Sequence, residues 1–155
     1  MFKNKKIFSW ALYDWANSSF STTVMAGFFP VFFKTYWSQG VSAVDTTARL
    51  GTAISISSFI IALVTPILGA ISDLKELKKS MLVFFMIMGS AHCIWLGFIG
   101  SGEWESAMMA YGMSMMAFSA SCVFYDSLLP TLGSEKDLDY ASSLGYSLGY
   151  RGAVS

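Results

Sequence analysis

The chain has 155 residues, of which 54% are hydrophobic, 16% aromatic and only 13% charged. Soluble domains carry roughly 25% charged residues, so this composition favours a lipid bilayer over a water-soluble core. The formal net charge is zero and the basic residues form no cluster typical of a nucleic-acid surface. We therefore expect a lipid bilayer, and no nucleic acid, as the environment and partner of this chain.

Five apolar stretches follow one another along the chain, and a membrane-spanning helix needs about 20 mostly apolar residues. The four that reach this length are 8–33, 50–71, 81–100 and 104–129. A fifth begins near Tyr140 and is still apolar at Ser155. Its roughly 22 Å of helix is shorter than the hydrocarbon core of about 30 Å. These lengths predict an all-α membrane protein with four complete transmembrane helices and a fifth, 140–155, that is cut short.

Short polar motifs mark where some of these helices begin and end. Ser42-x-x-Asp45 and Ser134-x-x-Asp137 have the form of a capping box before an apolar helix. Pro130 is expected to end the fourth stretch, because proline lacks the backbone donor that a helix requires. Pro30 and Pro66 lie inside predicted spans, where each removes one helical hydrogen bond.

Lysine and arginine are distributed unevenly between the two sides of the predicted membrane region. Three lysines precede the first span, three lie in the loop after the second and one follows the fourth, whereas the opposite side has only two basic residues. The first group is Lys3, Lys5, Lys6, Lys75, Lys78, Lys79 and Lys136, and the second is Lys34 and Arg49. Because basic loops stay in the cytoplasm, we expect a multi-pass protein with a cytoplasmic amino terminus. The bacterial inner membrane is the expected location.

A polar stripe runs along one face of the first predicted span. Its members recur at helical spacing of three or four and are Trp10, Asp14, Asn17, Ser18, Ser21, Met25 and Phe28. A polar stripe facing lipid is costly, so it should face protein or water. The stripe would line a transport cavity with Asp14 as a proton or cation site, or it would only join helices of the bundle. Both interpretations remain open at this stage.

Two further ionisable positions are candidate site residues. Asp126, beside Tyr125, lies near the end of the fourth span, where it is either a pathway residue or a simple helix-end charge. Arg151 lies about ten residues into the fifth stretch, near the expected membrane midplane, where an isolated charge is expensive. We expect Arg151 to pair with Asp14, Asp126, an anionic substrate or a residue outside this chain.

No enzyme, metal or cofactor motif is recognisable in the sequence. There is no phosphate-binding glycine loop, zinc helix motif or nucleophile elbow. Cys93 and Cys122 lie singly in apolar runs and are interpreted as buried packing residues. The sequence therefore predicts no catalytic residue, no metal site and no cofactor.

The loop after the second predicted span reads Gly69-Ala-Ile-Ser-Asp73-Leu-Lys75-Glu-Leu-Lys78-Lys79, with a glycine, an aspartate four residues later and a basic pair at the end. This loop resembles the signature loop of the major facilitator superfamily. The resemblance implies a conformational lock formed by Gly69, Asp73, Lys78 and Lys79. Leu74 stands where the family usually has arginine, and Glu76 where it has the central glycine.

A second resemblance covers nearly the whole chain and is to one particular branch of that superfamily. The run 13–20, Tyr-Asp-Trp-Ala-Asn-Ser-Ser-Phe, is similar to the first span of the vacuole effluxer, autophagy-related branch. The runs 26–30, 124–130 and 143–150 resemble the same branch. The resemblance implies part of the amino-terminal six-helix bundle of a transporter with about twelve spans. Fungal members of the branch are linked to release of amino acids from the vacuole.

Two functions from different classes follow from these patterns. The first is a secondary transporter that moves a small solute by alternating access, with its substrate site between two six-span halves. This function would require a carboxy-terminal half as a partner. The alternative is a small multispan interaction or assembly protein without transport activity, which would require the chain to end naturally at Ser155.

Overall fold

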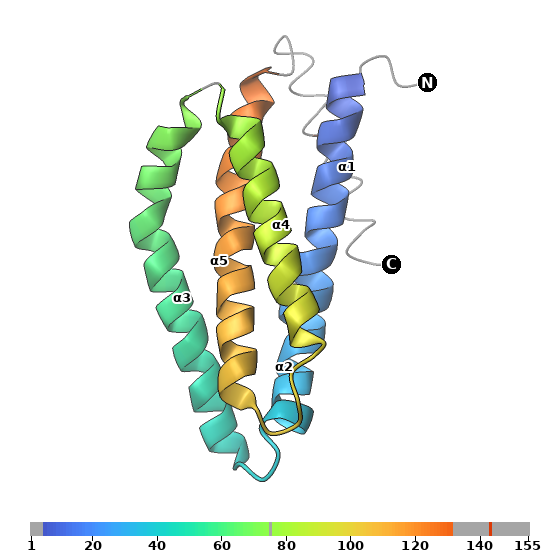
Figure 1. The fold of residues 1–155 in the computed structure, drawn as a ribbon, viewed down its shortest axis with the longest axis vertical. Helices are drawn as coiled ribbons and strands as arrows, with labels where there is room; N and C mark the ends of the chain where they lie inside the picture. Colours follow the sequence, from blue (N-terminus) through green and yellow to red (C-terminus); the bar gives the residue numbers. More distant parts are fainter. Residues whose placement is uncertain (1–4, 75, 132–142, 144–155) are drawn as a thin grey trace. The chain divides into compact units, whose positions relative to one another are not determined.

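A computed structural model describes residues 5–74, 76–131 and 143, and these described residues form helices and connecting turns without a strand. The chain divides into two compact units, residues 29–127 and residues 1–28 with 128–155. The smaller unit contains α1 (Lys5–Ser19), the π-helix η1 (Phe20–Phe28) and the short η3 (Leu129–Thr131). The helices of the larger unit are α2 (Phe29–Phe32), η2 (Phe33–Trp37), α3 (Ala43–Ser72), α4 (Lys78–Leu96) and α5 (Trp104–Leu128) (Figure 1). The last residue of α5, Leu128, is already assigned to the smaller unit.

Among the described residues, three helices are long and apolar enough to cross a membrane, and they agree with three of the predicted spans. They are Ala43–Ser72 with 30 residues, Lys78–Leu96 with 19 and Trp104–Thr131 with 28. Helix α3 begins at Ala43, before the predicted span 50–71, and includes the polar residues that precede its apolar run. The helix persists there because its first turn is capped rather than because it is apolar.

The cap of α3 is the one predicted from the sequence. The hydroxyl oxygen of Ser42 accepts a hydrogen bond from the backbone N–H of Asp45 at 3.1 Å, and the same hydroxyl donates to the Asp45 carboxylate at 2.7 Å. A side chain that satisfies a free N–H in this way stabilises the first turn by roughly 1 kcal/mol. Pro66 lies inside α3 without interrupting it, and α5 gives way to a 3-10 turn one residue before Pro130.

The first predicted span, 8–33, is helical over its whole length but is not one α-helix. The backbone alternates from α1 to the nine-residue η1, the four-residue α2 and the five-residue η2, and it passes from the smaller unit into the larger. No single α-helix in this stretch is long enough to count among the three spans, so the fourth complete span stays a prediction. The predicted fifth span, 140–155, lies outside the described residues except for Ser143.

The centre of the larger unit is α5. Half of the residues in its most apolar stretch are buried, against 6% in the corresponding stretches of α3 and α4. A Cβ atom added to Gly112 would lie 2.9 Å from the Ser57 hydroxyl of α3, and one added to Gly89 of α4 would lie 3.4 Å from the Ala117 Cβ. Small residues allow helix backbones to approach closely where lipid supplies no hydrophobic drive between helices.

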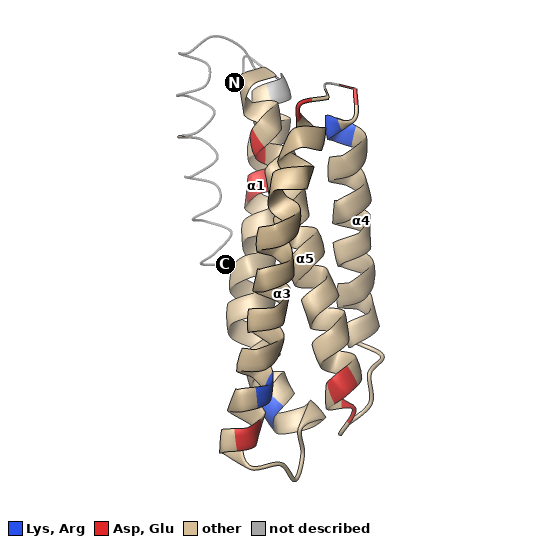
Figure 2. Cartoon of the chain, turned by 90° about the vertical axis from the view of Figure 1, so that its left-hand side faces the viewer, with Lys and Arg blue, Asp and Glu red and all other residues tan. Residues whose placement is uncertain are grey.

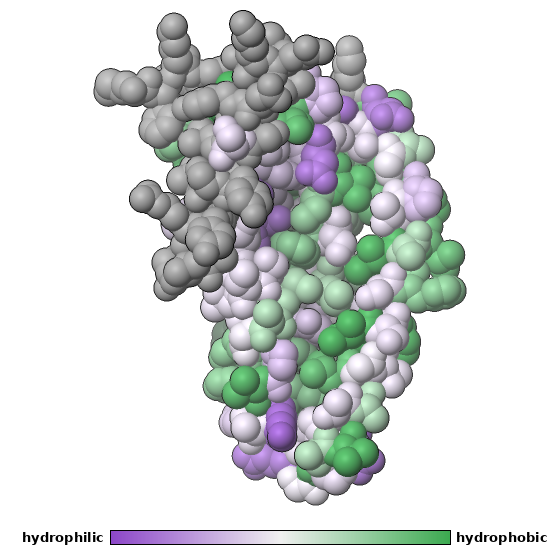
Figure 3. Space-filling model, turned by 180° about the vertical axis from the view of Figure 1, so that it is seen from behind, coloured by the Kyte–Doolittle hydropathy of each residue, from purple (hydrophilic) through white to green (hydrophobic). Residues whose placement is uncertain are grey.

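Charged residues of the larger unit lie at the two ends of its long helices, as Figure 2 shows. The runs 50–72, 80–102 and 106–125 contain no lysine, arginine, aspartate or glutamate. Apolar side chains cover much of the helical surface in Figure 3, and hydrophilic ones lie at its lower end and near its upper end. This separation matches a hydrocarbon layer bounded by two polar surfaces.

Candidate functional site

The predicted lock loop joins the end of α3 to the start of α4. Asp73 caps the carboxy-terminal end of α3, its backbone N–H donating to the Ala70 carbonyl at 3.3 Å, and its side chain is exposed. Ser72 Oγ donates to the Gly69 carbonyl at 2.7 Å. An added Cβ at Gly69 meets no atom within 4 Å of the described chain. Packing within the described residues therefore does not require glycine at this position.

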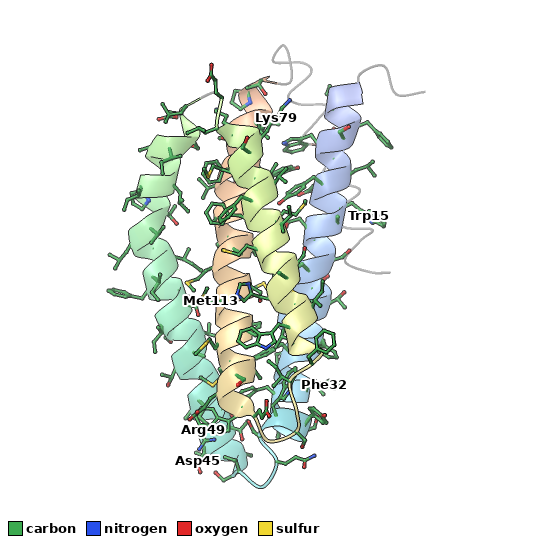
Figure 4. All side chains as sticks on the ribbon, in the orientation of Figure 1. Trp15, Phe32, Asp45, Arg49, Lys79 and Met113 are labelled. Atoms are coloured by element: carbon green, nitrogen blue, oxygen red, sulfur yellow. The ribbon has the colours of Figure 1, made fainter. Side chains whose placement is uncertain are left out.

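Lys78 is the lock residue with a long-range contact. Its ammonium nitrogen donates a hydrogen bond to the Ser127 carbonyl oxygen at 2.8 Å, across 49 positions of sequence. The acceptor is one of the last carbonyls of α5, where the helix dipole places partial negative charge and attracts a cation. The contact ties the start of α4 to the end of α5. Lys79, the next residue, is exposed at the same end of α4 (Figure 4).

Tyr125 and Asp126 lie beside this contact but face different surroundings. Tyr125 is buried at 5% exposure, whereas Asp126 is exposed. Tyr125 shares the buried surface of α5 with Tyr111 and Ser114.

The polar residues predicted on the first span lie at intermediate exposure. Asp14, Asn17, Ser18 and Ser21 are all half-buried in α1 and η1. The Ser18 carbonyl accepts hydrogen bonds from Ser21 Oγ at 3.0 Å and from Thr22 Oγ1 at 2.9 Å. Thr22 was not among the predicted site residues, because it lies beside the stripe when positions are counted at α-helical spacing. Arg151 lies outside the described residues, so its predicted pairing remains untested.

Aromatic residues dominate the opposite end of the larger unit. Phe29 stacks on Tyr111 of α5 with ring centroids 3.8 Å apart, and Trp37 Nε1 donates to the Ile99 carbonyl at 3.3 Å. The Arg49 guanidinium of α3 lies 3.9 Å from the Trp104 ring centroid, a cation–π contact with the first residue of α5. Figure 4 places Arg49 and Asp45 at this end of α3. These contacts fix α2 and α3 against α5, and η2 against the loop between α4 and α5.

Residues 5–74, 76–131 and 143 contain no group of three or more His, Cys, Asp or Glu side chains placed to hold a metal ion. His92 directs Nδ1 to the Met88 carbonyl of its own helix at 2.7 Å. This contact matches the role of a hydrogen-bonded packing residue.

Comparison with known proteins identifies the family. The model of the family described as vacuole effluxer Atg22 like matches residues 39–147. A Bacillus subtilis (strain 168) protein named as an uncharacterized MFS-type transporter, YxiO, is 43% identical over 147 residues, covering 94% of this chain and 34% of that protein. An uncharacterized Aquifex aeolicus (strain VF5) protein is 25% identical over 152 residues, covering 98% of this chain and 37% of that protein.

The chain thus spans about a third of the length of these two relatives. No solved structure matches it. The family match covers the signature loop, α4 and α5, and the Bacillus relative extends the similarity over most of the chain. The resemblance drawn from the first span and the signature loop is confirmed, and the chain belongs to the Atg22-like vacuole effluxer family of major facilitator proteins.

Proposed function

We propose that this chain is part of a secondary transporter that moves small solutes, with amino acids as the first class to test, by alternating access. The observation that carries the proposal is the hydrogen bond from Lys78 to the Ser127 carbonyl. It ties the signature loop of a major facilitator protein to the end of a neighbouring helix. A charge-assisted contact at a helix end holds one arrangement and can be exchanged for water in another.

Asp14, Asn17, Ser18 and Ser21 are the proposed pathway residues of the first helical stretch, with Asp14 as the proton or cation site. Half-burial supports this role, because a lipid-exposed carboxylate would be costly and a fully enclosed one could not exchange ions. Tyr125, Asp126 and Arg151 are proposed as further pathway residues. Gly69, Asp73, Lys78 and Lys79 form the proposed lock.

The direct test is solute uptake by a full-length protein carrying this segment, reconstituted into proteoliposomes and presented with amino acids and other small solutes. We expect uptake of at least one solute and its stimulation by a proton or cation gradient. The absence of uptake across the whole panel, by protein shown to be folded, would overturn the proposal and favour an interaction or assembly role.

Two variants assign the roles of individual residues in that assay. Asp14→Asn should alter the pH dependence of uptake, because the amide cannot exchange a proton, and unchanged pH dependence would remove Asp14 from the mechanism. Lys78→Met should alter the maximal rate at unchanged solute affinity, because it removes the contact with the Ser127 carbonyl and leaves the side chains of the proposed pathway residues unaltered. Lys34→Met is its matched control, since Lys34 is an exposed lysine outside both the proposed lock and the proposed pathway.

A further inference from the structure

The nine-residue π-helix η1 is an unusual element, because π-helical hydrogen bonding normally occurs as single-turn bulges that are frequent at functional sites. In an α-helix each carbonyl accepts from the N–H four residues later, and in a π-helix from the N–H five residues later. A segment that exchanges one pattern for the other turns the helix before it about its own axis. In this chain that preceding helix, α1, carries Asp14 and Asn17.

The junction between α1 and η1 has hydroxyl groups placed to ease such an exchange. The Ser18 carbonyl oxygen accepts hydrogen bonds from both Ser21 Oγ and Thr22 Oγ1, at 3.0 and 2.9 Å. A buried carbonyl without a hydrogen-bond partner is costly. A change of register, meaning a switch between the α-helical and π-helical hydrogen-bond patterns, would therefore normally be opposed by the loss of the backbone donor. With two hydroxyl donors already in place, the Ser18 carbonyl stays satisfied whichever backbone N–H it faces.

The other end of η1 has a glycine that suits the π-helical register. A Cβ atom added to Gly27 would lie 3.3 Å from the Thr22 carbonyl oxygen, which is five residues earlier and therefore the acceptor position of the π-helical pattern. This contact is with rigid backbone and would crowd the π-helix. Alanine is, by contrast, the residue most favourable to an α-helix.

We propose that η1 is a register switch that exists in both π-helical and α-helical forms and thereby turns the polar face of α1. The hydroxyls of Ser21 and Thr22 permit the exchange at one end, and Gly27 permits the π-helical form at the other. The functional consequence, reorientation of Asp14 and Asn17 during transport, rests on the proposed function. The existence of the two registers does not depend on it.

The test measures a distance along the segment in a purified full-length protein that carries it. Spin labels replace Leu12 and Phe28, whose side chains are 41% and 42% exposed, so the labels flank the junction. In an α-helix these positions are about 24 Å apart along the axis, and the π-helical form is shorter because it packs more residues into each turn. We expect two distance populations in the unaltered sequence.

Gly27→Ala should shift the populations toward the longer, α-helical distance, whereas the matched control Gly51→Ala should leave them unchanged, since Gly51 meets no atom within 4 Å. Ser21→Ala combined with Thr22→Val should leave a single population, because the junction loses the donors that serve both registers. A single distance that Gly27→Ala does not change would overturn the inference. Two registers in a protein that moves no solute would contradict the proposed function but not the switch.

Discussion

Helices α3 and α5 of the larger unit are both long and apolar, but they have opposite roles in packing. The most apolar stretch of α5 is half buried, while that of α3 is 6% buried. The exposed face of α3 contains Ile56, Phe59, Leu63 and Ile67, each between 57% and 65% exposed. The buried face of α5 contains mainly alanine, glycine and serine.

The difference shows that apolar character and burial are separate properties in a membrane helix. Lipid solvates large apolar side chains as well as a protein core does, so these side chains can stay on the outside. Tight helix contact instead depends on small residues that bring backbones together. Substitutions on α5 should therefore be more damaging than larger chemical changes on α3.

The largest effect is expected from enlarging a buried small residue of α5. Ala117 is fully buried, and its Cβ is close to the position that a side chain at Gly89 of α4 would occupy. Ala117→Leu should destabilise the fold by about 1–3 kcal/mol, because the helices must separate or shift to admit the added atoms. Unfolding of the purified protein in mixed detergent micelles measures this loss. An equally stable variant would show that the α4–α5 contact is adaptable.

A smaller effect is expected from one added methyl group at the contact of α5 with α3. Gly112→Ala places a Cβ 2.9 Å from the Ser57 hydroxyl, which must move, and we expect a cost of roughly 1 kcal/mol in the same unfolding assay. Gly51→Ala on α3 is the matched control, because its new methyl group meets open space. That control should be neutral or slightly stabilising, since alanine favours the helix. Equal losses for the two variants would contradict the central position of α5.

The smallest effect is expected from removing a large aromatic ring on the outside of α3. Phe59 is 65% exposed in the described structure, so Phe59→Ala should change stability by no more than about 0.5 kcal/mol. A loss as large as that of Ala117→Leu would show that another protein surface, rather than lipid, covers this face. Unfolding in the same detergent mixture gives the comparison directly.

The candidate site was predictable only in part. Lys78 was identified from the signature spacing, but its partner is the backbone carbonyl of Ser127, and every residue has such a carbonyl. The change from α1 to the π-helix η1 was not predicted, because counting at 3.6 residues per turn assumes an α-helix throughout the first stretch. The cation–π contact of Arg49 with Trp104 joins residues far apart in sequence without a local pattern.

The sequence by itself determined the helical class, three spanning helices, the cap of α3 at Ser42 and the family. Each follows from local information, because the width of a bilayer requires a minimum apolar length and a cap needs only neighbouring residues. Only the tertiary structure decided that α5 is central, that Lys78 reaches Ser127 and that the first stretch consists of α-helical and π-helical segments in succession. These features depend on how closely helix backbones approach and on which carbonyl meets which donor. Neither is encoded in the apolar pattern of a single helix.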